Sequence, residues 1–213
     1  MCVIAAGFFF TDFGRLFLYS FFIGAFGVRG GDTMTKNDNA HSVRLVGSLE
    51  KHIGYETAKE FEANYPLSKS ADIEKKYQWA KAICSYLEEH YDRDTIVSIR
   101  KDCRCNDGKS IASKLLKYLN RTDSIQDFVS LFNQNETFAS LEYISDNKIW
   151  FCYPQCYCSC VKRVPQELSK TWCYCTLGNA EGIFSEVFKK NVKVTLLQSI
   201  KTGAEKCVIE VEW

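Results

Sequence analysis

The sequence predicts an α+β fold in which an N-terminal helical part precedes a mostly antiparallel sheet that carries one embedded helix. Two observations support this prediction. Apolar residues recur at three- and four-residue steps over residues 40–135, as they do on one face of amphipathic helices. After residue 136 the pattern changes to short alternating runs separated by turn residues, as in strands. We therefore expect a single domain over residues 34–213, with a sheet part at 136–213.

Four segments of the helical part have an apolar stripe that we expect to face the core: Val43–Ile53, Ile73–Tyr91, Ile111–Leu119 and Ile125–Phe132. Two glycines weaken the first segment. Ser70 is the expected N-cap of the second helix, and acidic residues in its first turn favour the helix dipole. Thr122 is the expected cap of the last helix.

Five strands are expected in the sheet part, at Phe138–Ile144, Lys148–Tyr153, Gln155–Val164, Val192–Ile200 and Lys206–Trp213. Turn residues at 145–147 join the first two strands, and Pro165 closes the third. The embedded helix is expected over Ser169–Phe188. Alternation of apolar and polar residues from Val192 marks a half-buried strand.

The composition is that of an ordinary soluble chain with one core. Of 213 residues, 46% are hydrophobic, and 27 basic residues balance 26 acidic ones. This balance leaves no net field to attract nucleic acid or an anionic membrane, so we expect no nucleic-acid partner. The sequence contains no glycine-rich phosphate loop, no Gly-x-Ser-x-Gly and no His-Glu-x-x-His.

Residues 1–31 differ in composition from the rest, because they hold eight of the fifteen phenylalanines. Their apolar run is shorter than the roughly 20 residues of a membrane-spanning helix. Three interpretations stay open: a mis-called start with Met34 as the true one, a weak membrane anchor, and a signal peptide. We treat residues 1–33 as a doubtful leader, with membrane contact only if residues 1–31 are translated.

Seven of the eleven cysteines lie after residue 150, in a density that packing alone rarely produces. A disulfide across one intervening residue closes a strained ring, so the Cys-x-Cys pairs favour free thiols in a reducing, cytoplasmic compartment. Such thiolates suit a thiophilic metal. The predicted metal ligands are Cys156, Cys158, Cys160, Cys173, Cys175 and Cys207, with Cys103, Cys105 and Cys152 as secondary candidates. Zinc is the first choice of metal, and iron or an iron–sulfur cluster is the alternative.

The expected geometry brings these cysteines together. Cys156, Cys158 and Cys160 are spaced by two, which would place them on one face of a strand. Cys173 and Cys175 lie where a loop becomes a helix, and the helix N-terminus is expected to lower the thiol pKa. The alternative interpretation makes the cysteines small buried hydrophobes, which we expect for Cys84. For Cys2 we make no prediction.

The histidines and glutamates give little indication of a catalytic site. His52 and His90 are expected at the surface, and His41 in a flexible lead-in. Glu181 and Glu186 are candidate helpers for thiolate or metal chemistry, although solvated helix positions are the simpler interpretation.

Cys173-Tyr174-Cys175 precedes a helix with small residues, a Val-rich strand starts at Val192, and Gly203 and Cys207 are four residues apart. In these features the last forty or so residues resemble the four-vinyl-reductase ligand-binding domain. The resemblance implies the mixed fold of nitric-oxide-signalling and Golgi-transport ligand-binding domains, with a pocket for a small hydrophobic ligand. The cysteine series also resembles an uncharacterised bacterial cysteine-rich family, and the tail is similar to aminothiazoline-carboxylate hydrolases. The cysteine run at 152–160 departs from the usual ligand-binding domain.

Two functions of different class follow. The first is a metal-binding, small-molecule-binding or sensing domain, and the second is a thiol- or metal-dependent hydrolase or reductase. The absence of a plausible base beside the thiolates favours the first, and whether the chain is an enzyme stays open.

Overall fold

The computed structural model describes residues 36–213, so our interpretations of residues 1–33 and of the start at Met34 lie outside the described residues. The described residues 36–213 form one compact unit. Its helical part contains α1 (Ala40–His52), α2 (Tyr55–Asn64), α3 (Ile73–His90), α4 (Arg93–Asp102), α5 (Lys109–Leu119) and α6 (Ile125–Asn135). Its sheet part contains β1 (Ser140–Ser145), β2 (Lys148–Tyr153), α7 (Lys170–Cys173), α8 (Cys175–Phe188), β3 (Lys193–Gln198), the 3₁₀ turn η1 (Ile200–Thr202) and β4 (Cys207–Glu212). The α+β prediction is confirmed.

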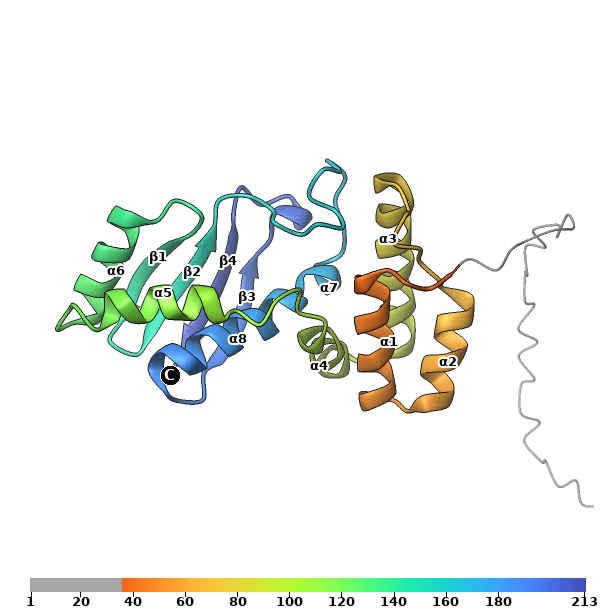
Figure 1. The fold of residues 1–213 in the computed structure, drawn as a ribbon, viewed down its shortest axis with the longest axis horizontal. Helices are drawn as coiled ribbons and strands as arrows, with labels where there is room; N and C mark the ends of the chain where they lie inside the picture. Colours follow the sequence, from red (N-terminus) through yellow and green to blue (C-terminus); the bar gives the residue numbers. More distant parts are fainter. Residues whose placement is uncertain (1–35) are drawn as a thin grey trace, which may run out of the picture. The chain divides into compact units, whose positions relative to one another are not determined.

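The four strands form one antiparallel sheet in the order β1-β2-β4-β3. Its register aligns a row of buried side chains across all four strands: Leu141, Phe151, Ile209 and Leu196. Helix α8 lies across one face of the sheet, and α5 lies beside α8. Helices α1 to α4 gather at the other end of the unit (Figure 1). The ring of Phe184 in α8 meets that of Phe151 edge-on, with centroids 5.2 Å apart.

Two predicted helix caps are wrong by two residues. Asp72 caps α3 by accepting from the backbone N–H of Lys75, whereas the Ser70 hydroxyl bonds to Ser68. Ser124 caps α6 by accepting from the backbone N–H of Asp127. The Thr122 hydroxyl instead donates back to carbonyls at the end of α5. Both caps supply the side-chain oxygen that a helix N-terminus requires.

Helix α8 approaches α4 closely enough to require a glycine. A Cβ atom at Gly178 would lie 2.0 Å from the carbonyl oxygen of Lys101. This contact matters to the site, because α4 leads directly into the segment that carries Cys103 and Cys105. Among residues 36–213, no helix has the length and apolar character needed to cross a bilayer.

We predict that Gly178→Ala destabilises the fold by about 1–3 kcal/mol, since the added methyl group must push two helices apart. Gly47→Ala is the matched control, because a Cβ there meets nothing within 4 Å in the middle of α1. It should stabilise by about 0.5–1 kcal/mol through helix propensity. Urea unfolding of the three proteins measures both effects, and similar midpoints for the two variants would contradict the packing described.

Candidate functional site

A cavity of about 360 Å³ lies beside the end of the sheet where β2 stops and β4 begins. Six of its lining residues are cysteines: Cys105, Cys156, Cys158, Cys173, Cys175 and Cys207. The rest of its wall is mostly aromatic, apolar or amide in character. This volume is within the usual range of small-molecule sites.

The six sulfurs come from four separate stretches of the chain. Cys105 follows α4, and Cys156 and Cys158 follow β2. The remaining three are placed by regular elements: Cys173 ends α7, Cys175 begins α8 and Cys207 begins β4. The convergence of Cys156, Cys158, Cys173, Cys175 and Cys207 on one cavity wall follows from the fold, since these segments are up to 51 residues apart in sequence.

The strand predicted at Gln155–Val164 is absent, so Cys156, Cys158 and Cys160 do not share a strand face. The segment is a series of turns in which the Cys158 carbonyl accepts from the N–H groups of Val161 and Lys162. Two physical reasons explain the difference. Pro154 directly follows β2 and has no N–H to donate, and β2 already pairs with β1 and β4 on its two sides.

Cys160 consequently leaves the predicted set. It is 1% exposed, and its thiol points to the Lys76 carbonyl of α3 at 3.7 Å instead of lining the cavity. Cys105, a secondary candidate, takes its place on the cavity wall. Cys103 and Cys152 are buried outside the cavity, where their thiols donate to the Ile99 carbonyl and the Glu142 carboxylate. Cys84 is a buried packing residue, as expected.

The thiol pKa values differ in direction from the expectation for Cys173 and Cys175. Burial raises the pKa of Cys173 to about 12, although the Ser199 hydroxyl donates to its sulfur at 3.1 Å. Burial also raises the pKa of Cys175 strongly, against the lowering effect of Arg100. Cys173 ends α7 and Cys175 begins the 14-residue α8, and at both positions burial outweighs any effect of the helix N-terminus. Thiols that stay protonated are weak nucleophiles.

Burial is the main cause of the raised thiol pKa at Cys105 and Cys156 as well. Together with Cys173 and Cys175, these thiols stay protonated at neutral pH.

Arg100 lies behind the cavity wall with its side chain buried, 3% exposed. Its Nη2 atom donates to the Trp172 carbonyl at 2.8 Å, and the guanidinium lies 4.6 Å from the centre of the Trp172 ring. Among the described residues its Nε atom has no hydrogen-bond partner. Burial opposes the charge of Arg100, but the neighbouring cysteines, Cys103 and Cys175 first, raise its pKa overall, so the guanidinium stays charged.

His41 lies in α1 and not in a flexible lead-in, which corrects our expectation. Its Nε2 atom is 3.1 Å from the Ser159 hydroxyl, and Arg44 donates towards its Nδ1 atom at 3.4 Å. Arginine can only donate, so the ring proton is assigned to Nε2 and His41 donates to Ser159. In this tautomer His41 cannot accept a proton from the Ser159 hydroxyl. The hydrogen bond between His41 and Ser159 holds the cysteine-bearing turns against α1.

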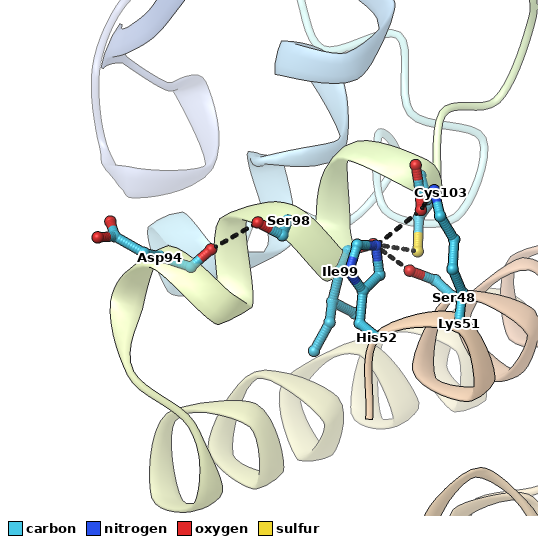
Figure 2. A network of polar contacts seen from close by, with 8 residues as sticks. Ser48, Lys51, His52, Asp94, Ser98, Ile99 and Cys103 are labelled. Atoms are coloured by element: carbon cyan, nitrogen blue, oxygen red, sulfur yellow. Dashed lines mark hydrogen bonds and ion pairs between the residues drawn. The ribbon is translucent and has the colours of Figure 1, made fainter. Parts of the chain in front are cut away.

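His52 and His90 are exposed, as predicted. Figure 2 shows Lys51 and His52 on α1 beside the end of α4, where both bond to Asp102 at 2.7 and 2.8 Å. In the same view Ser48 and Cys103 point to the Ile99 carbonyl, which accepts from Ser48 at 2.7 Å. These contacts hold α4, and with it Arg100, against α1.

A second, more open cavity of about 450 Å³ lies between α1, α4 and α8. Its wall includes the ion pairs Lys51–Asp102 and Lys101–Glu181, which are at least partly exposed to solvent. Glu186 pairs with Lys189 at the surface. The two glutamates are therefore solvated helix positions, and neither lines the cysteine cavity.

The cysteine sulfurs surround the cavity without converging on a single point. Within residues 36–213, no group of three or more His, Cys, Asp or Glu side chains is arranged to hold a metal ion. All ten cysteines in this range are free thiols. The donor set is thiol-rich, and its present spacing leaves an open space between the sulfurs.

Residues 34–212 match a family of unknown function, DUF6144. The chain belongs to this family. The comparison with curated proteins gives no match. The resemblances to four-vinyl-reductase domains, to an uncharacterised cysteine-rich family and to aminothiazoline-carboxylate hydrolases are not confirmed by these findings.

Solved structures of H-NOX domains resemble the fold at low similarity. The Shewanella oneidensis domain in the Fe(II)CO state has 12% identity and a TM-score of 0.40, covering 82% of this chain and 97% of that one. An Fe(II) unliganded H-NOX mutant from K. algicida has 10% identity and a TM-score of 0.39, and the match covers 82% of this chain and 96% of that one. The IWP-051-bound domain from Shewanella woodyi has 13% sequence identity and a TM-score of 0.38, and the match covers 81% of this chain and 92% of that one.

We predict that His41 makes the fold less stable in mild acid. Burial, followed by the charges of Arg44, Arg100 and Lys76, lowers the pKa of His41 from 6.5 to about 4. The unfolded chain therefore binds a proton between pH 6.5 and 4 that the folded chain does not, so stability falls as the pH falls through this window. His41→Gln keeps a polar side chain and should reduce the drop in melting temperature between pH 7 and 5. An equal drop in both proteins would contradict this assignment.

Proposed function

We propose that residues 34–213 form a binding domain whose cysteine-lined cavity holds a thiophilic metal centre. One observation carries the proposal: six cysteines from four stretches of the chain line a single cavity of about 360 Å³. Cysteine sulfur favours zinc, iron and iron–sulfur clusters. Zinc is the first candidate, with iron or an iron–sulfur cluster as the alternative. The free thiols fit a reducing compartment, and we propose the cytoplasm.

Metal binding in this proposal closes the sulfurs around the metal. Zinc takes four ligands at about 2.3 Å from each sulfur, which is closer than the open arrangement described above. The turns that carry Cys156 and Cys158 are irregular, and both residues are only partly buried. These turns are therefore the part of the wall best able to move inward. Binding energy would then stabilise the fold, as in other structural metal sites.

The remainder of the cavity suits the apolar part of a small molecule. Ile111, Phe138 and Leu196 contribute to its wall beside the sulfurs. Apolar side chains with a few polar groups are typical of ligand sites. A sensing role follows if such a molecule contacts the metal centre and changes how the cysteine-bearing turns close.

The enzyme alternative has less support. Among the described residues, the cavity wall contains no histidine, aspartate or glutamate that could act as a general acid or base. The raised pKa values of Cys173 and Cys175, caused by burial, make these thiols poor nucleophiles without a metal. Both observations favour binding over thiol-based catalysis.

The direct test is metal analysis of the full chain purified without oxygen, together with its absorption spectrum. A stoichiometric metal is expected: zinc gives no visible absorption, and an iron–sulfur cluster gives a coloured protein. A protein that lacks metal, and takes up neither zinc nor iron on reconstitution, would overturn the proposal.

We predict that Cys173→Ser and Cys175→Ser each remove most of the metal. Losing about 3 kcal/mol of binding energy should lower the melting temperature by about 6–12 °C. Cys84→Ser and Cys152→Ser are matched controls, since both cysteines are buried but lie outside the cavity. The controls should keep the metal, whatever their effect on stability. Equal metal content in all four variants would contradict the assigned ligands.

A further inference from the structure

The more open cavity, between α1, α4 and α8, has a positively charged wall. Four of its lining side chains are cations and two are carboxylates, which gives a net charge of +2. The cations are Arg44, Lys51, Lys101 and Arg104, and the carboxylates are Asp102 and Glu181. The other lining residues are a serine and two glycines, so no large apolar residue lines it. Its volume of about 450 Å³ is within the usual range of small-molecule sites, so the cavity suits a small polar anion.

The two lysines of this wall already have anionic partners. Lys51 pairs with Asp102 at 2.7 Å, and Lys101 pairs with Glu181 at 3.0 Å. Figure 2 shows Lys51 on α1 beside the end of α4. Each pair joins two of the three helices around the cavity and neutralises one lysine. The net charge of the wall is therefore that of its two arginines.

Neither arginine has an anionic partner in the described part of the chain. Arg44 donates to two neutral groups, the His41 ring at 3.4 Å and the Cys105 thiol at 3.8 Å. Its buried Nε atom has no hydrogen-bond partner among residues 36–213, and over the same range the exposed Arg104 side chain forms neither a hydrogen bond nor an ion pair. A guanidinium presents a planar set of N–H donors that matches the oxygens of a phosphate or carboxylate group. Two such groups on one cavity wall favour an anionic ligand.

Two glycines leave room at this wall. Gly47 lies in the middle of α1 and lines the cavity, and a Cβ atom there would have nothing within 4 Å. Glycine in a helix interior is less stable than alanine, and no close contact at Gly47 requires it. In α8, a Cβ atom at Gly182 would lie 2.6 Å from Nη1 of Arg104. The first glycine therefore keeps the cavity open, and the second lets the Arg104 guanidinium lie against α8.

We infer that this cavity binds a phosphate monoester of a small, hydroxyl-bearing molecule, and that Arg44 and Arg104 hold the phosphate group. Such a group carries a charge of about −1.5 to −2 at neutral pH and has three strong acceptor oxygens. It therefore matches two guanidiniums better than a single carboxylate does. Asp102 and Glu181 can accept hydrogen bonds from the hydroxyl groups of the rest of the molecule. Binding here needs no metal in the cysteine cavity.

The first test is isothermal titration calorimetry of the full chain with glycerol phosphate, compared with glycerol and with inorganic phosphate. Glycerol phosphate should bind, and glycerol should give no binding heat. Inorganic phosphate should bind at least about 5-fold more weakly, because it lacks the hydroxyl-bearing part. Equal affinity for inorganic phosphate would overturn the assignment of a monoester. No binding of glycerol phosphate at millimolar concentration would overturn the site.

Matched variants locate the binding. Arg104→Gln should weaken the affinity for glycerol phosphate by about 10- to 100-fold, because it removes charge-assisted hydrogen bonds. Arg121→Gln removes the same charge from an exposed turn between α5 and α6, and should bind as the wild type does. Equal affinity in these two variants would place the phosphate elsewhere and overturn the inference.

A third variant fills the cavity without removing an arginine. Gly47→Glu improves the helix propensity of α1 and adds a carboxylate at the cavity wall, where it competes with the phosphate group for the arginines. It should weaken glycerol phosphate binding by about 10-fold or more while the melting temperature is maintained or raised. Wild-type affinity in Gly47→Glu would contradict the site. None of the three variant positions lines the cysteine cavity, so a failure here leaves the proposed metal site standing.

Discussion

The burial of Arg100 against Trp172 is the interaction on which the two parts of the fold depend. Arg100 comes from α4 and Trp172 from α7, so their contact joins the helical part to the sheet part. Trp172 is 2% exposed and also meets Trp79 of α3 edge-on, with ring centroids 5.9 Å apart. Burying a guanidinium without a carboxylate costs several kcal/mol unless another negative charge is near. In the described part of the chain the Trp172 carbonyl and the face of the Trp172 ring hold this guanidinium.

The two parts contribute different components to the cavity. The helical part supplies Cys105, which follows α4 where that helix packs closely against Gly178 of α8. The sheet part supplies the other five sulfurs. Neither part alone has a complete cavity wall. Metal binding would therefore couple the two parts, and a ligand that changed the metal centre would act on both.

Periodicity predicted most of the elements, because each helix or strand with one buried face leaves a local pattern in the sequence. The strand pair around Asp146 and the helix that begins near Cys175 follow this rule. The segment at 155–164 was mispredicted because its alternating cysteines imitate a strand. No local pattern reveals that β2 already has a partner on each side. Pro154 was the available signal, since a proline directly after a strand often ends the pairing.

The candidate site was predicted in part for the same reason. Spacing identified Cys173, Cys175 and Cys207, which regular elements position. It could not separate Cys105, which lines the cavity, from Cys160, which bonds to α3, because tertiary contacts alone decide this. The burial of Arg100 gave no sequence signal, because this residue lies in a segment rich in charged and polar residues. The burial that raises the pKa of Cys173 likewise depends on packing and not on the helix start.

X-ray absorption at the edge of the bound metal tests the central claim most directly, because it reports the ligand atoms around the metal. The account predicts a shell of about four sulfur atoms at about 2.3 Å in the full chain as purified. This shell should persist in Cys84→Ser and lose sulfur in Cys175→Ser. A first shell of nitrogen and oxygen atoms, with no sulfur, would contradict the assignment of the cysteine cavity as the metal site.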